Sequence, residues 1–217
     1  MKTEKLFSSD ELEAIREATT AAETQTGGEI VPYIVERVFE SDHARWRGAT
    51  LGALAAALAA GLAHALGSFL GGAGVWWITL PAIAGAGLGY LIAGIDAVGR
   101  KLIPDDHVDR VVAMRAEAAF LEEEVFDTRD RTGILVFLSL FERRAVILAD
   151  AGINRAVPED TWQELVDHLV EGIRRGRAAE AMRQAVTRCG EILAEHEVAL
   201  RPDDEDELSD APRIRER

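Results

Sequence analysis

Charged side chains are missing from one long stretch of this sequence. Between Arg47 and Asp96 the chain has no Asp, Glu, Lys or Arg, and this stretch is about twice as long as one bilayer crossing requires. A soluble helical hairpin would keep a polar stripe, and neither half of the stretch has one. The absence of charge therefore predicts two transmembrane helices, near 48–68 and 75–96, joined by a turn at the glycines of 67–74.

Cysteine and basic residues are also scarce. The single cysteine, Cys189, excludes an intramolecular disulfide framework and a zinc site built on paired thiolates. Lys and Arg total 24 against 38 Asp and Glu, which gives a formal net charge of -14. The few cations form no cluster, so we expect no nucleic-acid partner, because such a partner needs a concentrated basic face.

The cations that flank the uncharged stretch predict its orientation. Arg45 and Arg47 precede the first span, Arg100 and Lys101 follow the second, and the turn between the spans carries no charge. The positive-inside rule then places both ends of the chain in the cytoplasm. Residues 48–98 are thus expected to form a transmembrane hairpin, with the lipid bilayer as a partner.

Glycines four residues apart recur in both predicted spans. The first span has Gly48 and Gly52, and the second has Gly85 and Gly89. Such ridges of small residues let helix backbones approach closely. The sequence leaves open whether the ridges pair within one hairpin or between two chains, so a homo-oligomer is one of the expectations.

The rest of the sequence predicts an α/β domain that the hairpin divides. Before the hairpin, a capping box at 8–11 begins a helix that ends at Gly27 and Gly28, and a strand follows at 30–38. Pro32 lacks a backbone donor, so this strand is expected to begin late or to lie at a sheet edge. After the hairpin we expect a helix at 105–126, strands at 133–140 and 145–149, and helices at 158–176 and 177–196.

Neither part of this domain has enough strands to form a stable sheet alone. A sheet needs three or more strands and helical cover, and only residues 1–47 and 102–200 together supply them. We therefore expect these two segments to fold as one cytoplasmic domain. Residues 201–217 are polar and begin with an acidic run, so they are expected to form a flexible tail.

The motifs of several enzyme classes are absent. The sequence has no Gly-x-x-x-x-Gly-Lys-Ser/Thr loop, no Gly-x-Gly-x-x-Gly after a strand and no His-Glu-x-x-His helix. Glu195 stands six positions after Cys189, where a cysteine phosphatase has arginine. No catalytic nucleophile can therefore be assigned from the sequence.

Acidic residues at the ends of the predicted strands are the remaining candidates for a site. They are Glu29, Asp127, Asp130 and Asp150. If the strands are neighbours, these carboxylates would gather at one end of the sheet and suit a hard cation such as Ca²⁺ or Mg²⁺. Arg129 and Arg131 lie in the same loop, so neutralisation by arginine or by solvent is the alternative.

Four segments of the chain together are similar to a known family. They are Leu6–Ser8 before the first helix, Ala22–Ile30, Arg131–Leu135 and Arg144–Ile153, and they resemble the TPM domain, named for thylakoid-lumen, photosystem II repair and receptor-accessory proteins. The resemblance covers 6–47 and 105–200 and is closest to a bacterial membrane branch in which a hairpin interrupts the domain. It implies a three-layer α/β/α sandwich with a small mixed sheet, located at the bacterial inner membrane.

The resemblance also implies two functions. Some members bind divalent cations and have a proposed acid phosphatase activity, whereas others resemble accessory or repair factors of membrane complexes. We expect a membrane-anchored interaction, assembly or repair factor with a membrane-protein partner, because no nucleophile is identifiable. The alternative is a hydrolase that resembles a divalent-cation-dependent acid phosphatase.

Overall fold

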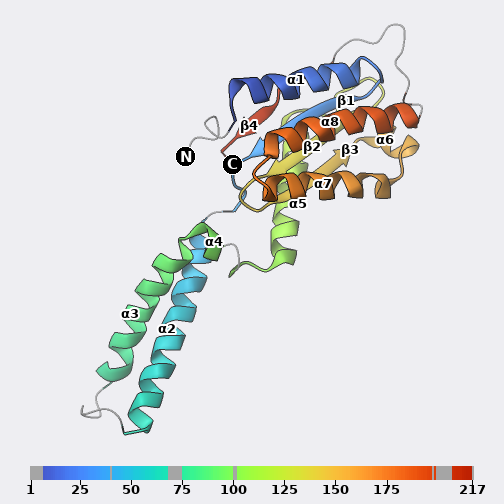
Figure 1. Cartoon of the computed structure of the whole chain (residues 1–217). Coiled ribbons are helices and arrows are strands. Elements are labelled where there is room, and N and C mark those ends of the chain that lie inside the picture. Colours follow the sequence, from blue (N-terminus) through green and yellow to red (C-terminus); the bar gives the residue numbers. More distant parts are fainter. Residues whose placement is uncertain are drawn as a thin grey trace. The chain divides into compact units, whose positions relative to one another are not determined.

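A computed structural model of the chain describes residues 7–39, 41–67, 75–99, 102–196, 198 and 207–216. Contacts divide the chain into two compact units. The sheet unit comprises Met1–Val38 and Asp109–Arg217, and the hairpin unit comprises Phe39–Val108 (Figure 1). The hairpin unit is therefore inserted into the sequence of the sheet unit.

The sheet unit contains a four-stranded mixed sheet in the order β3-β2-β1-β4. Strands β1 (Glu29–Val35) and β2 (Gly133–Ser139) pair in parallel and are buried along their whole length. Strand β3 (Arg144–Ala149) is antiparallel to β2, and β4 (Arg213–Arg215) is parallel to β1. Burial of whole strands is typical of a sheet with helices on both faces.

The position of Pro32 differs from the prediction. Strand β1 begins before this proline and lies in the interior of the sheet, between β2 and β4. The N–H groups of Glu29 and Glu36 donate to Thr132 and Arg215 respectively, so the even-numbered residues of β1 turn their backbone groups toward the β4 side. Strand β4 begins opposite Tyr33. The side of Pro32 that lacks an N–H group therefore faces a position that none of the described strands reaches.

The predicted flexible tail is wrong for the part of it that the structure describes. Residues 207–216 lie along the sheet unit, and Ile214 pairs with Ile34 of β1. Arg213 Nε donates to Glu123 Oε2 at 3.1 Å, and Arg215 Nη2 donates to Oε1 at 2.9 Å. Backbone pairing with β1, one isoleucine and two ion pairs thus help to hold a segment whose composition suggested disorder. Residues 201–206 and 217 lie outside the described residues.

Helices cover both faces of the sheet. Helices α1 (Ser9–Glu23), α7 (Gln163–Arg174) and α8 (Ala178–Glu195) lie on one face, where they enclose the main hydrophobic core, and α5 (Asp105–Glu122) lies on the other (Figure 1). Two short helices, α6 (Ala151–Ala156) and the 3-10 helix η3 (Glu159–Trp162), connect β3 to α7. The predicted three-layer α/β/α sandwich is confirmed.

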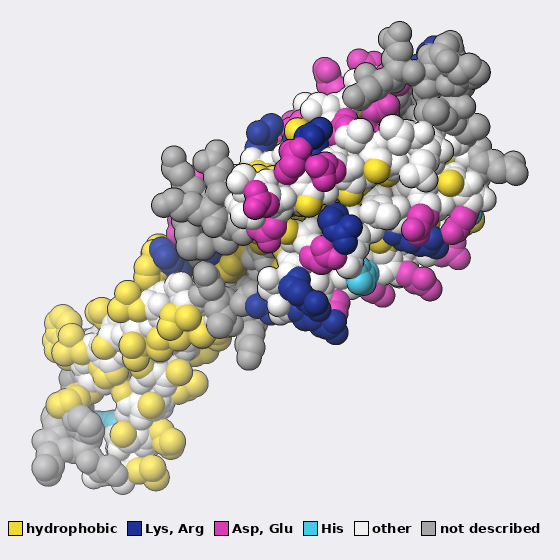
Figure 2. All heavy atoms as spheres, turned by 45° about the horizontal axis from the view of Figure 1, so that its top comes forward, with side chains coloured by type: hydrophobic (Ala, Val, Ile, Leu, Met, Phe, Trp, Pro, Cys, Tyr) yellow, Lys and Arg dark blue, Asp and Glu magenta, His cyan; other side chains and the backbone are white. Residues whose placement is uncertain are grey.

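The hairpin unit contains two apolar helices. Helix α2 (Ser41–Ala65) and helix α3 (Trp76–Ala93) are long and apolar enough to cross a membrane, and the short α4 (Asp96–Gly99) follows. Large apolar side chains point outward, such as Leu54 with 57% exposure and Leu58 with 66%. Figure 2 shows hydrophobic side chains gathered over this unit and charged ones over the sheet unit.

The two glycine ridges face each other within this hairpin. A Cβ atom on Gly52 would overlap the carbonyl oxygen of Gly85, and one on Gly89 would overlap that of Gly48. The backbones of α2 and α3 therefore approach too closely for any larger residue. A homo-oligomer that used these same ridges would have to replace the packing within the hairpin.

Candidate functional site

The four predicted cation ligands are placed around one end of the sheet. Glu29 begins β1 opposite Gly133, the first residue of β2, and Ile134 pairs with Ala149, the last residue of β3. Asp127 and Asp130 precede β2, and Asp150 follows β3. The topology thus brings these chain segments to the same end of the sheet. Whether the carboxylates can bind a cation depends on the groups that each one already contacts.

Asp150 is held by an arginine. Its side chain is only 6% exposed, and Arg131 donates from Nε to Oδ2 at 2.6 Å and from Nη2 to Oδ1 at 3.0 Å. Oδ1 also accepts the Ala151 N–H at 2.6 Å, which caps α6. The hydrogen bond with Asp150 raises the pKa of the Arg131 guanidinium. Both oxygens of this carboxylate are thus occupied by the protein itself.

The backbone around Arg131 fixes this arrangement. Arg131 has a φ of 61°, in the left-handed region that non-glycine residues rarely adopt. Its carbonyl accepts the Gly152 N–H at 2.7 Å, and a Cβ atom on Gly152 would overlap the carbonyl oxygens of Asp130 and Arg131. Glycine at position 152 therefore lets the loop before β2 dock against α6, which brings Arg131 to Asp150.

Glu29 is bound by the segment that leads to β4. It is buried, and its carboxylate accepts the N–H groups of Glu207 at 3.4 Å and Leu208 at 3.3 Å. Glu207 in turn accepts the Arg129 N–H at 3.0 Å. Glu29 thus helps to fasten the 207–216 segment to the start of β1.

This arrangement does not fit a resident divalent cation. Arg131 already supplies positive charge to Asp150, and backbone N–H groups occupy the Glu29 carboxylate. Among the residues that the structure describes, no group of three or more His, Cys, Asp or Glu is arranged to hold a metal ion. Calcium or magnesium binding by Glu29, Asp127, Asp130 and Asp150 stays a prediction, and calorimetric titration with these cations tests it.

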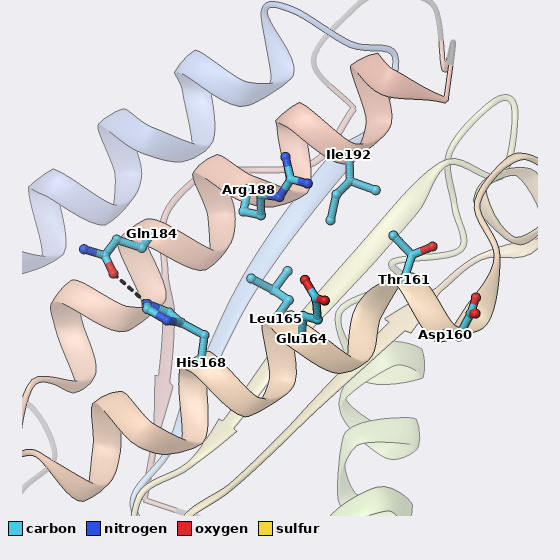
Figure 3. Close-up of a pocket in the computed structure, with 8 residues that line it drawn as sticks. All are labelled: Asp160, Thr161, Glu164, Leu165, His168, Gln184, Arg188 and Ile192. Atoms are coloured by element: carbon cyan, nitrogen blue, oxygen red, sulfur yellow. Dashed lines mark hydrogen bonds between the residues drawn. The ribbon is translucent and has the colours of Figure 1, made fainter.

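A second candidate is a groove between α7 and α8 that the sequence analysis did not identify (Figure 3). The cavity is about 560 Å³, and Leu165 and Ile192 provide its apolar lining. Its polar lining consists of Asp160, Thr161, Glu164, His168, Gln184 and Arg188. Asp160, Glu164 and His168 are spaced four residues apart, and this spacing is the sequence signal for one shared face.

The charges in this groove are unevenly paired. Arg188 Nη1 donates to Glu191 and Glu195, both at 2.9 Å, so its positive charge is neutralised on α8. Within the described part of the chain, the carboxylates of Asp160 and Glu164 have no such partner. The groove therefore presents net negative charge beside an apolar lining.

The groove contains no recognisable catalytic pair. His168 Nε2 lies 2.7 Å from Gln184 Oε1, and Figure 3 shows this imidazole pointing toward Gln184 rather than toward Thr161. Nucleophilic catalysis by a hydroxyl requires a base within hydrogen-bond reach. The thiol of Cys189 is buried in the core, and burial raises its pKa to about 12. These groups therefore suit binding better than catalysis.

Comparisons with known proteins show a match to one family model and a likeness of fold to one solved structure. The family model of the TPM domain matches residues 100–192. The NMR structure of the BA42 protein from the psychrophilic bacterium Bizionia argentinensis is similar, with a TM-score of 0.58 and 18% sequence identity over 96% of this chain and 94% of that chain. At this level of identity the likeness is one of fold. No curated protein matches the sequence.

Proposed function

Because residues 100–192 match the family model of the TPM domain, we propose that the chain is a membrane-anchored accessory factor that binds another membrane protein through this domain. The observation that carries this proposal is the groove between α7 and α8, which has an apolar lining and the carboxylates of Asp160 and Glu164. Neither carboxylate has an ion-pair partner among the residues that the structure describes. Such a surface suits a partner segment with one apolar side chain and one basic side chain. An accessory role in assembly or repair requires this binding and no chemical step.

Membrane anchoring is supported by the hairpin unit. Helices α2 and α3 expose leucines on their outer faces, which would be costly in water and favourable in lipid. Arg45 and Arg47 stand at the start of α2, and Arg100 and Lys101 lie outside the described residues. Under the positive-inside rule both termini are cytoplasmic, at the bacterial inner membrane.

Reporter fusions test this orientation. A reporter that is active only in the periplasm should be silent after Arg217 and active when inserted at Gly71. The reverse pattern would refute the orientation. Release of the chain from membranes by alkaline carbonate would refute the anchoring itself.

Site-specific photo-crosslinking in living cells tests the groove. A photoreactive residue at position 168, which lines the groove, should give an adduct with a membrane protein, whereas one at Asp167, exposed on the same helix outside the lining, should not. The substitution Glu164→Lys should abolish the adduct by reversing the charge beside it. Equal labelling from positions 167 and 168, or labelling that Glu164→Lys leaves unchanged, would exclude the groove as the docking site.

The alternative function is divalent-cation-dependent hydrolysis of phosphate esters, and it is favoured only by the carboxylates gathered at the sheet end. The ion pair of Arg131 with Asp150 opposes it. Calorimetric titration with Ca²⁺ and Mg²⁺, together with turnover of a generic phosphate ester, separates the two functions. Cation binding and turnover that Asp150→Asn abolishes would establish the hydrolase and overturn the accessory role.

A further inference from the structure

We propose that Arg47 and Trp46 form a binding site for the phosphate group of an anionic phospholipid at the start of α2. The inference rests on the proposed function, since it requires the hairpin to lie in a bilayer. It adds a ligand class and a site within the hairpin unit. The ligand is the lipid headgroup together with the upper part of its acyl chains.

The site is a cavity with one polar end and one apolar end. Its volume is about 560 Å³, and it is lined by Asp42, Trp46, Arg47, Thr50, Leu51 and Leu102. Trp46 and Leu51 are 67% and 55% exposed. Leu51 continues into the outward leucines of α2, so a molecule bound beside Arg47 would extend its apolar part along the helix. This shape suits an amphiphile better than a free anion.

The guanidinium of Arg47 provides the anion-binding group. Arg47 is exposed, and its Nη1 donates to the Leu102 carbonyl at 3.1 Å, which fixes the side chain in the cavity wall. Its other N–H groups have no acceptor within the described ranges. A guanidinium can donate two parallel hydrogen bonds to phosphate oxygens. The remaining N–H groups of Arg47 are therefore available for a phosphodiester.

The neighbouring arginine is engaged differently. Arg45 lies with Cζ 5.7 Å from the centre of the Tyr90 ring, and its Nη1 lies 4.0 Å from Asp42 Oδ1. Arg45 thus lies beside the Asp42 carboxylate and near the face of the Tyr90 ring of α3, and it does not line the cavity. This difference makes Arg45 a matched control for Arg47 at the same membrane boundary.

Trp46 supplies the interfacial part of the site. Its indole packs edge-on against Tyr90, with ring centres 5.8 Å apart and an angle of 72°. Indole rings favour the headgroup level of a bilayer, where the N–H group can donate to phosphate or ester oxygens. Thr50 donates its hydroxyl proton to the Trp46 carbonyl at 3.0 Å, so it shapes the wall and does not donate to the lipid.

Native mass spectrometry of the full chain tests the site. The protein is released from nanodiscs of equal parts phosphatidylglycerol and phosphatidylcholine, and retained lipids are counted. We expect preferential retention of phosphatidylglycerol, reduced about tenfold in Arg47→Gln by loss of a charge-assisted contact and nearly unchanged in Arg45→Gln. Equal losses in the two variants would mean diffuse attraction and would overturn the site.

Two further measurements make the outcome decisive. Inorganic phosphate in excess should leave the retained phosphatidylglycerol unchanged, and displacement would reassign the site to soluble anions. Carbonate extraction of the same variants reports membrane insertion separately. If all variants insert but the wild type shows no lipid preference, this inference alone fails. If none inserts, the proposed anchoring fails with it.

Discussion

The substitution Ile34→Ala is expected to destabilise the whole sheet unit, including the part that follows the hairpin. Ile34 is 0% exposed and lies in β1 between Leu138 of β2 and Ile214 of β4. Truncation of a fully buried isoleucine to alanine costs about 2–5 kcal/mol, because the tight surroundings collapse only partly. A loss of about 3.5 kcal/mol lowers the folding equilibrium constant by roughly two to three orders of magnitude.

Hydrogen exchange of the full chain in detergent micelles measures this effect. The slowest amides of β2 and α8 exchange only through global opening if the unit is cooperative. Their protection should then fall by roughly 100-fold to 1,000-fold in Ile34→Ala. The substituted residue lies before the hairpin and the reporting amides lie after it, so equal losses would show that both segments fold as one domain.

The control is Leu54→Ala, a similar truncation on the outer face of α2. Leu54 is exposed in the hairpin unit, so protection in β2 and α8 should stay at the wild-type level. The reasoning is refuted if Ile34→Ala loosens β1 while β2 and α8 keep their protection. In that case residues 109–217 would fold without the first segment.

Three further predictions concern the core, the hairpin and β4. Burial raises the pKa of the Cys189 thiol from 9.0 to about 12, so the unfolded chain loses the thiol proton at a lower pH than the folded chain. The free energy of unfolding should therefore fall as the pH rises from 9 to 12. Thermal melts should show a larger fall for the wild type than for Cys189→Ala. Gly85→Val should force α2 and α3 apart, seen as a longer spin-label distance, whereas Gly61→Val, with nothing within 4 Å, should not. Glu123→Ala should remove the ion pairs to β4 and raise exchange of residues 207–216 about tenfold while the core stays protected.

Long patterns in the sequence made the hairpin and the sandwich predictable. The uncharged stretch is long enough to predict two apolar helices without ambiguity. Strand β2 corresponds to an unbroken apolar run of strand length. Strand β4 has no such pattern, because its three residues include one apolar side chain, Ile214. Its order depends on Glu123, which is 90 residues from Arg213 in the sequence. Local composition carries no information about such a partner.

The candidate sites were predictable only in part. Strand order brings the loop of Asp127 and Asp130 to the end of β3, and the strand ends were visible in the sequence. Arg131, and not Arg129, pairs with Asp150 because the backbone at Arg131 has a positive φ. An arginine in the sequence gives no indication of such a backbone conformation. The groove also requires the register of α8 on α7, which two separate amphipathic patterns do not specify.

Pro32 has a consequence during biosynthesis. The ribosome completes β1 long before β2, because the hairpin unit and α5 are made in between. At 5–20 residues per second, about 100 residues of synthesis leave β1 without its neighbour for roughly 5–20 s. An apolar strand with two open edges invites pairing with other chains. Pro32 removes one donor from an edge of β1, so a second nascent chain cannot extend a continuous ladder along it.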